Sequence, residues 1–128
     1  VLARLMVQAL PPGWPLEAVA YVPASRPAVR RRGFDHGELL GRAVAAQAGL
    51  ECLPLLHRPR TRDQRGLSAR GRIANLAGRF EAAGDAPCRG GVLLVDDVMT
   101  TGATLCAAAA ALRSAGCPAL YGLTFARV

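Results

Sequence analysis

The stretch GVLLVDDVMTTGATL, residues 91–105, constrains the fold of this chain more than any other feature. Its first five residues form a continuous apolar run, which is typical of a strand that is covered on both faces, as in a parallel sheet. Two adjacent aspartates, Asp96 and Asp97, end the run, and a short turn rich in hydroxyl groups follows. The stretch therefore predicts a buried strand from Gly91 to Val95 with a ligand site at its carboxyl end.

Strands and helices are predicted to alternate along the rest of the chain, which indicates an α/β fold with right-handed crossovers. Asp35 and Glu38 have the spacing of a capping box, which predicts the start of a helix. Pro54 interrupts an apolar run and favours an edge strand there. Residues 23–34 and 57–72 are rich in arginine and are predicted to be loops. The other expected strands are Ala18–Val22, Leu50–Leu56 and residues 119–128, and the expected helices are Gly37–Ala48 and the stretch that carries Leu105, Ala109 and Leu112.

Composition places the chain among globular proteins of one domain. It has 128 residues, of which 52% are apolar and 20% charged, and this length allows a sizeable core. The longest apolar run, Cys106 to Leu112, is too short to cross a bilayer, so we expect a cytoplasmic protein that does not enter the membrane. The net charge is +7, and all 16 basic residues are arginines. The run from Arg30 to Arg32 is a local positive field that would attract phosphate groups.

The cysteines and histidines form no metal-binding pattern. No two cysteines have the close spacing of a zinc site, and His36 and His57 complete no such site. We therefore predict no metal held by the protein itself. The cysteines are expected to be reduced and mostly buried, and they are Cys52, Cys88, Cys106 and Cys117.

The residues after the central strand have the chemistry of a sugar-phosphate site. Two adjacent carboxylates repel each other, so they favour a ligand that donates hydrogen bonds to them, such as a sugar with its hydroxyl groups. The turn from Thr100 to Thr104 offers backbone N–H groups at a helix start, which suit a phosphate, and Gly102 allows close approach. A lone acid at a helix start is more simply an N-cap. Strand, paired acids, turn and helix in unbroken order favour the sugar-phosphate interpretation.

The segment VLLVDDVMTTGATL resembles the phosphoribosyl pyrophosphate (PRPP) motif of type I phosphoribosyltransferases. Over residues 21–127, the segments RRRGFDHGELLGRAVA and LLHRPRTRDQRGLSARGRIANLAGRF also resemble the ComF family, competence-associated proteins that are amidophosphoribosyltransferase-like. The resemblance implies a Rossmann-like, mostly parallel sheet flanked by helices. Residues 1–15 alone would supply the hood that selects the acceptor, so the hood is expected to be reduced or missing. Because the family's N-terminal zinc-binding cysteines have no counterpart here, residues 1–128 are expected to form a single domain.

The resemblance also implies roles for individual residues. Asp96 and Asp97 would accept hydrogen bonds from the ribose hydroxyls and act in catalysis. The 5′-phosphate would be held by Thr100, Thr101, Gly102, Ala103 and Thr104. The pyrophosphate would meet the turn of residues 23–26, with Ser25 and Arg26, and the flexible loop of residues 58–64, with Arg58 and Arg60. Magnesium would arrive bound to PRPP, without a protein ligand.

Two functions are compatible with the sequence. The first is transfer of a phosphoribosyl group from PRPP to a nitrogen acceptor, which the resemblance does not name. The second is a non-catalytic protein that senses PRPP or handles single-stranded DNA during DNA uptake, because the arginines allow contacts with phosphates. Single-strand binders usually interleave aromatic and basic residues, and this basic region offers only Phe34 and Phe80. A homodimer is compatible with either function.

Overall fold

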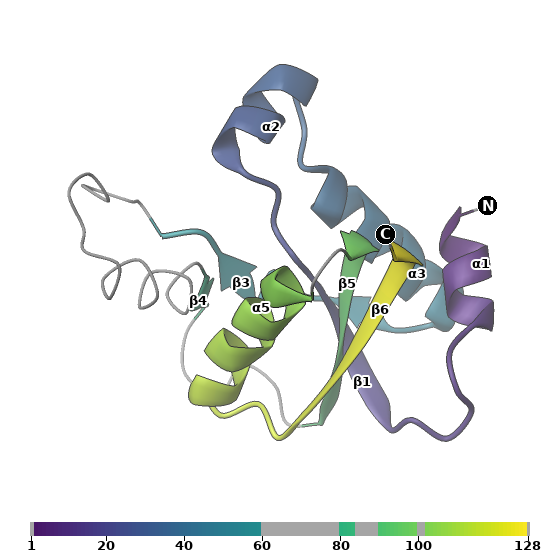
Figure 1. Cartoon of the computed structure of the whole chain (residues 1–128). Helices are drawn as coiled ribbons and strands as arrows, with labels where there is room; N and C mark the ends of the chain where they lie inside the picture. Colours follow the sequence, from purple (N-terminus) through teal and green to yellow (C-terminus); the bar gives the residue numbers. More distant parts are fainter. Residues whose placement is uncertain (1, 60–79, 84–89, 100–101, 128) are drawn as a thin grey trace.

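The computed structural model describes residues 2–59, 80–83, 90–99 and 102–127. Its centre is a four-stranded sheet in the order β2-β1-β5-β6, in which every neighbouring pair is parallel. The carboxyl ends of the strands therefore meet at one edge, which is the upper edge in Figure 1. The strands are β1 (Leu16–Tyr21), β2 (Glu51–Cys52), β5 (Gly91–Met99) and β6 (Ala119–Arg127).

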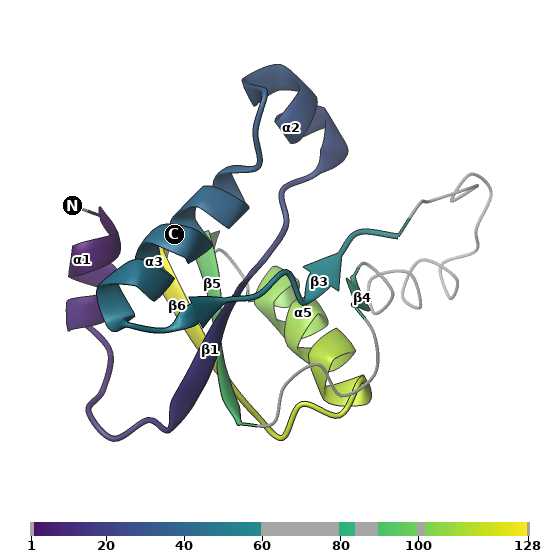
Figure 2. The ribbon, with the colours of Figure 1, turned by 180° about the vertical axis from the view of Figure 1, so that it is seen from behind.

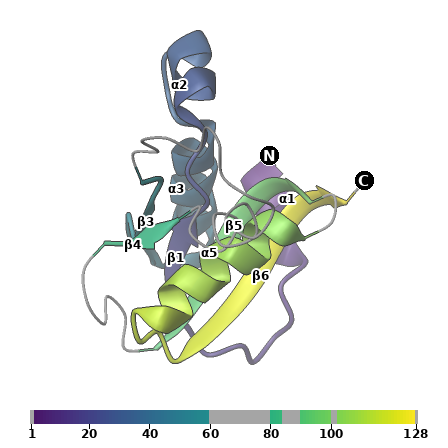
Figure 3. The same ribbon diagram turned by 60° about the vertical axis from the view of Figure 1, so that its left-hand side comes forward.

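Helices cover both faces of the sheet (Figures 2 and 3). Helices α1 (Leu2–Gln8) and α3 (His36–Ala48) pack on one face, against a buried cluster that includes Val19, Leu93 and Val95. Helix α5 (Ala103–Ser114) packs on the other face. It lies there with a small antiparallel pair, β3 (Leu56–His57) and β4 (Glu81–Ala82). Within the described residues, the N-terminal segment adds one helix to the α3 layer and no separate hood.

Most of the predicted elements are confirmed. Strands near Ala18–Val22 and at residues 119–127 are present, and α3 and α5 lie where the apolar spacing predicts them. The predicted strand Leu50–Leu56 is instead divided between β2 and β3, because Pro54 lies between two short pairings. Its first part, β2, is at the edge of the sheet, as the proline indicated.

The prediction of a loop over residues 23–34 is wrong, because helix α2 (Arg26–Arg32) lies within it. The Ser25 hydroxyl caps the helix by accepting a hydrogen bond from the Ala28 N–H at 3.3 Å. Pro27 lies in the first turn, where its missing N–H is tolerated, and Gly33 ends the helix with a φ of 80°. Helix α2 extends beyond the carboxyl edge of the sheet (Figures 1 and 3).

The expectation for the cysteines is also partly wrong. Cys52 is a half-buried free thiol and Cys106 is an exposed one, whereas the buried Cys117 takes part in a disulfide. Cys106 is exposed because it lies on the side of α5 that faces away from the core. None of the helices in the described ranges is both long and apolar enough to span a bilayer.

Candidate functional site

The two aspartates lie in the part of β5 that projects beyond β1. Strand β1 ends at Tyr21, opposite Val95, and the Val22 N–H donates to the Val95 carbonyl at 3.0 Å. Strand β5 was predicted to end at Val95, but it continues to Met99 because β6 pairs with it along its full length. Asp96 and Asp97 are therefore held in extended backbone with β6 on one side and the loop after β1 on the other.

The environment of the aspartates is electrostatically unfavourable for two negative charges. The pKa of Asp96 is raised to about 6, chiefly by burial and also by the negative charge of Asp97 beside it. A hydrogen bond of 3.0 Å from the Asp97 N–H to Asp96 Oδ1 and the nearby His36 both act in the opposite direction. Adjacent acids in this situation favour a ligand that brings hydroxyl donors or positive charge.

Helix α5 begins a few residues after the aspartates. Its N-cap, Gly102, has a φ of 83° and contributes no capping side chain. This left-handed conformation confirms that the turn requires glycine there. Ala103 is exposed and Thr104 is partly exposed, so the first turn of α5 is open to solvent. Three of the predicted site residues, Arg60, Thr100 and Thr101, lie outside the described residues.

Asp35 organises the loop after β1. Its Oδ1 accepts hydrogen bonds from the Gly37 N–H at 2.9 Å and the Glu38 N–H at 3.2 Å, as expected of an N-cap. The same oxygen also accepts from the Ala24 N–H at 3.1 Å. The sequence predicted the cap but not this third bond, which ties the loop to the start of α3.

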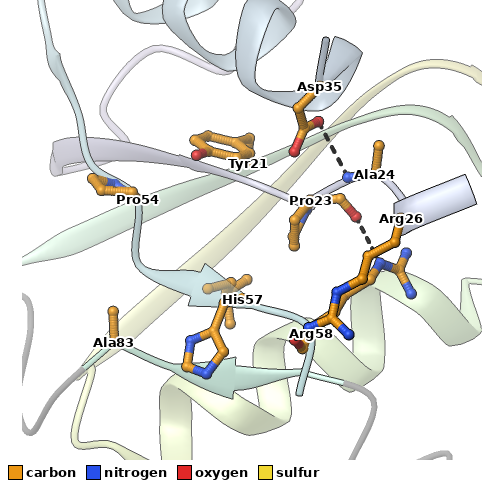
Figure 4. Close-up of a pocket in the computed structure, with 10 residues that line it drawn as sticks. Tyr21, Pro23, Ala24, Arg26, Asp35, Pro54, His57, Arg58 and Ala83 are labelled. Carbon is orange, nitrogen blue, oxygen red and sulfur yellow. Dashed lines mark hydrogen bonds between the residues drawn. The ribbon is translucent and has the colours of Figure 1, made fainter. Parts of the chain in front are cut away.

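The loop of residues 23–26 borders a pocket of about 400 Å³ (Figure 4). Two of the predicted arginines, Arg26 and Arg58, line it. Arg26 Nη2 donates to the Arg58 carbonyl at 3.3 Å, and Arg58 Nε donates to the Pro23 carbonyl at 3.0 Å. The Arg58 guanidinium also lies 4.8 Å from the centre of the Phe80 ring. The structure therefore brings these two arginines together beside the loop, and their contact with a ligand stays a prediction.

The lining of the pocket includes neither Asp96 nor Asp97. The pocket is closed by Pro54, Leu56 and Ala83, which come from the β3–β4 side. Ser25, which was also predicted to contact the ligand, uses its hydroxyl to cap α2. Ser25 does not line the pocket, and its role in ligand binding stays a prediction.

Sequence reasoning missed one contact at the aspartates. His36 Nε2 lies 3.3 Å from Asp97 Oδ2, although the two residues are far apart in the chain. The only local signal is that His36 directly follows the N-cap of α3, and α3 starts beside the carboxyl edge of the sheet. Among the described residues, no three metal-ligating side chains come together.

Several solved structures have the same arrangement of elements. The first, described as the allosteric regulatory enzyme of purine biosynthesis, superimposes with a TM-score of 0.66 at 18% identity over 97% of this chain. Glutamine PRPP amidotransferase from B. subtilis gives 0.65 at 18% identity over 94%, and an adenine phosphoribosyltransferase gives 0.62 at 19% identity over 99%. The chain has the type I phosphoribosyltransferase fold.

The match to these phosphoribosyltransferases is one of fold. The chain spans 24% of the length of each of the first two proteins and 66% of the adenine phosphoribosyltransferase. The sequence matches no protein-family model and no curated protein.

Proposed function

We propose that the chain is a phosphoribosyltransferase-like domain of the ComF type that binds PRPP. One observation carries this proposal. On a phosphoribosyltransferase fold, two adjacent carboxylates project past β1, and a left-handed glycine and the open first turn of α5 follow a few residues later. One short segment of the chain therefore supplies carboxylates that can bind a sugar and backbone N–H groups that can bind a phosphate.

The proposed placement assigns each part of PRPP to one element. Asp96 and Asp97 accept hydrogen bonds from the ribose hydroxyls. The 5′-phosphate lies at the start of α5, against residues 100–104. The pyrophosphate lies at the loop of residues 23–26, where Arg26 and Arg58 already point into a pocket, and Arg60 would join them. Arginine suits this end because its planar guanidinium matches phosphate oxygens.

The proposed reaction is transfer of the phosphoribosyl group to a nitrogen nucleophile. The nitrogen forms a bond to the anomeric carbon, the bond from that carbon to the pyrophosphate oxygen breaks, and pyrophosphate leaves with the electron pair. The nucleophile then releases a proton to solvent. The carboxylates stabilise the positive charge that develops on the ribose, and the arginines stabilise the departing anion.

Magnesium fits this site as a partner of the ligand. The lining of the pocket at the pyrophosphate end includes the guanidinium groups of Arg26 and Arg58, which suit a charged phosphate. When bound with PRPP, Mg²⁺ would neutralise part of the negative charge of the pyrophosphate.

Calorimetry with Mg²⁺ and PRPP tests the assignment. We expect saturable binding to the wild type and none to the double variant Asp96→Asn, Asp97→Asn. A matched control is Glu51→Gln, which removes one exposed carboxylate from β2 and should bind as the wild type does. Undiminished binding by the double variant would remove the site assignment. Release of pyrophosphate in the presence of candidate amines would then test the chemistry itself.

One observation favours a second candidate function, which is binding of single-stranded DNA. Arg30, Arg31 and Arg32 are all exposed on the projecting helix α2, and the neighbouring Phe34 is 46% exposed. Together they offer charge for phosphates and one ring for stacking.

A labelled single-stranded oligonucleotide tests this second function. Its binding should weaken steeply with salt and be lost when the three arginines become alanine. The control replaces three exposed arginines elsewhere, Arg4, Arg42 and Arg113, and keeps the same net charge. Equal binding by the two triple variants would reject α2 as the contact surface.

A further inference from the structure

The contact between His36 and Asp97 is the least expected feature of the site. His36 Nε2 lies 3.3 Å from Asp97 Oδ2, with 29% of the imidazole and 44% of the aspartate side chain exposed. The other ring nitrogen, Nδ1, is buried and has no hydrogen-bond partner within the described residues. The imidazole is therefore anchored to its surroundings through the nitrogen that faces the aspartate.

The backbone fixes where His36 lies. Its neighbour Gly37 packs so closely on the Val22 carbonyl that a Cβ atom would clash with it. One turn later, a Cβ on Gly41 would lie 2.8 Å from the Tyr21 Cβ. These two glycines set the start of α3 directly on the end of β1. The position of His36 thus follows from close backbone packing rather than from a flexible side chain.

The pleat of β5 brings Asp97 to the same place. Successive side chains of a strand point to opposite faces, so Asp97 shares a face with Val95 and Leu93. Both of these pack into the cluster beneath α1 and α3. Asp97 therefore lies on the α3 side of the sheet, and the first residue of α3 is the one that reaches it.

The surroundings also select a tautomer for the ring. A carboxylate faces Nε2, and none of the described residues offers Nδ1 an acceptor. A proton on Nε2 is therefore stabilised, whereas a proton on Nδ1 would have no partner among those residues. In this form the ring presents an N–H to Asp97 and restrains the rotation of its carboxylate.

We propose that His36 is a positioning residue that orients Asp97 toward the ribose hydroxyls of the ligand. This inference rests on the proposed function, in which Asp97 is one of the two carboxylates that bind the sugar. His36 acts through Asp97 and does not itself touch the reacting atoms. A fixed carboxylate loses less conformational freedom when the ligand binds, so the contact should increase affinity for the sugar and not for the pyrophosphate.

Two amide substitutions separate positioning from general packing. Gln places its amide nitrogen near the position of Nε2, whereas Asn places it near that of Nδ1. His36→Gln should therefore retain Mg²⁺–PRPP affinity within about threefold, and His36→Asn should lose about tenfold or more, as expected for one hydrogen bond to a charged group. Both variants should bind Mg²⁺–pyrophosphate as the wild type does. Equal affinities of the Gln and Asn variants for PRPP, or a parallel loss of pyrophosphate binding, would overturn the proposal.

Nitrogen-15 NMR of the imidazoles tests the contact without any ligand. The chain has two histidines, and His57→Gln identifies the signals of His36. At pH 8 we expect a protonated Nε2 and an unprotonated Nδ1, and a mixture of tautomers in Asp97→Ala. An Nδ1–H tautomer in the wild type would show that the contact is absent. If the wild type fails to bind Mg²⁺–PRPP, the proposed function and the positioning role both fail, while the tautomer still decides whether the contact exists.

Discussion

Replacement of Asp96 by asparagine should stabilise the fold while removing ligand binding. The pKa of Asp96 is raised from 3.8 to about 6, chiefly by burial, so the folded protein binds this proton more tightly than the unfolded chain does. The wild type therefore loses stability as pH rises from about 4 to about 6, and the loss persists at higher pH. Asparagine mimics the protonated acid and keeps an oxygen that can accept from the Asp97 N–H.

The expected gain is moderate. The shift corresponds to about 3 kcal/mol at about 1.4 kcal/mol per pH unit, and solvent screening of a partly exposed carboxyl reduces this to about 1–2 kcal/mol. Urea unfolding at pH 8 should show Asp96→Asn to be more stable than the wild type by this amount. At pH 3.5 the two proteins should be nearly equally stable, because the wild-type carboxyl is then mostly protonated in both states.

Glu51→Gln serves as the control for net charge, since it also removes one negative charge from a strongly basic chain. Its effect on stability should be small and nearly independent of pH. The reasoning is refuted if Asp96→Asn is no more stable than this control at pH 8, or if its advantage persists unchanged at pH 3.5.

Three further substitutions test how the site is held. Gly102→Ala should lower stability by about 1 kcal/mol and weaken PRPP binding, because φ is 83° there. The control Gly122→Ala should change neither property, because a Cβ atom has room there. Thermal melting measures the stability of each variant, and calorimetry measures its affinity for PRPP. Gly37→Ala should cost about 2 kcal/mol or more in urea unfolding despite the helix propensity of alanine, because the new Cβ meets the Val22 carbonyl. Asp35→Ala should cost about 2 kcal/mol in the same assay, since three backbone N–H groups lose their shared acceptor, and an unchanged midpoint would contradict that role.

The sequence predicted best those elements that local physics determines. The continuous apolar run before Asp96 is typical of a covered strand, and β5 confirms it. The prediction of a loop over residues 23–34 was wrong because it gave more weight to the charge and proline content than to the helix-capping residues. Ser25 and Gly33, at the two ends of α2, were both readable as helix signals. The extension of β5 past Val95 could not be predicted from the local sequence, because it depends on pairing with β6.

In the candidate site, too, the features that depend on local sequence could be predicted, and those that depend on tertiary packing could not. The turn after β5 is a local motif, and the φ of Gly102 could be inferred from it. By contrast, the third hydrogen bond of Asp35 and the contact of His36 depend on where α3 meets the end of β1. The spacing of residues in the sequence does not predict where α3 contacts the end of β1. In the sequence Gly37 is an ordinary helical glycine, and only the structure shows that it packs against the Val22 carbonyl.

Two hydrogen bonds hold the two arginines of the pocket in place. Like charges brought together repel, yet Arg26 donates to the backbone carbonyl of Arg58, and Arg58 donates to that of Pro23. Each guanidinium thus satisfies part of its hydrogen-bonding capacity on a backbone carbonyl. These two hydrogen bonds hold the arginines beside the loop of residues 23–26. Because the same bonds fix the loop, loss of the Arg58 side chain should disturb both the charge of the pocket and the position of the loop that borders it.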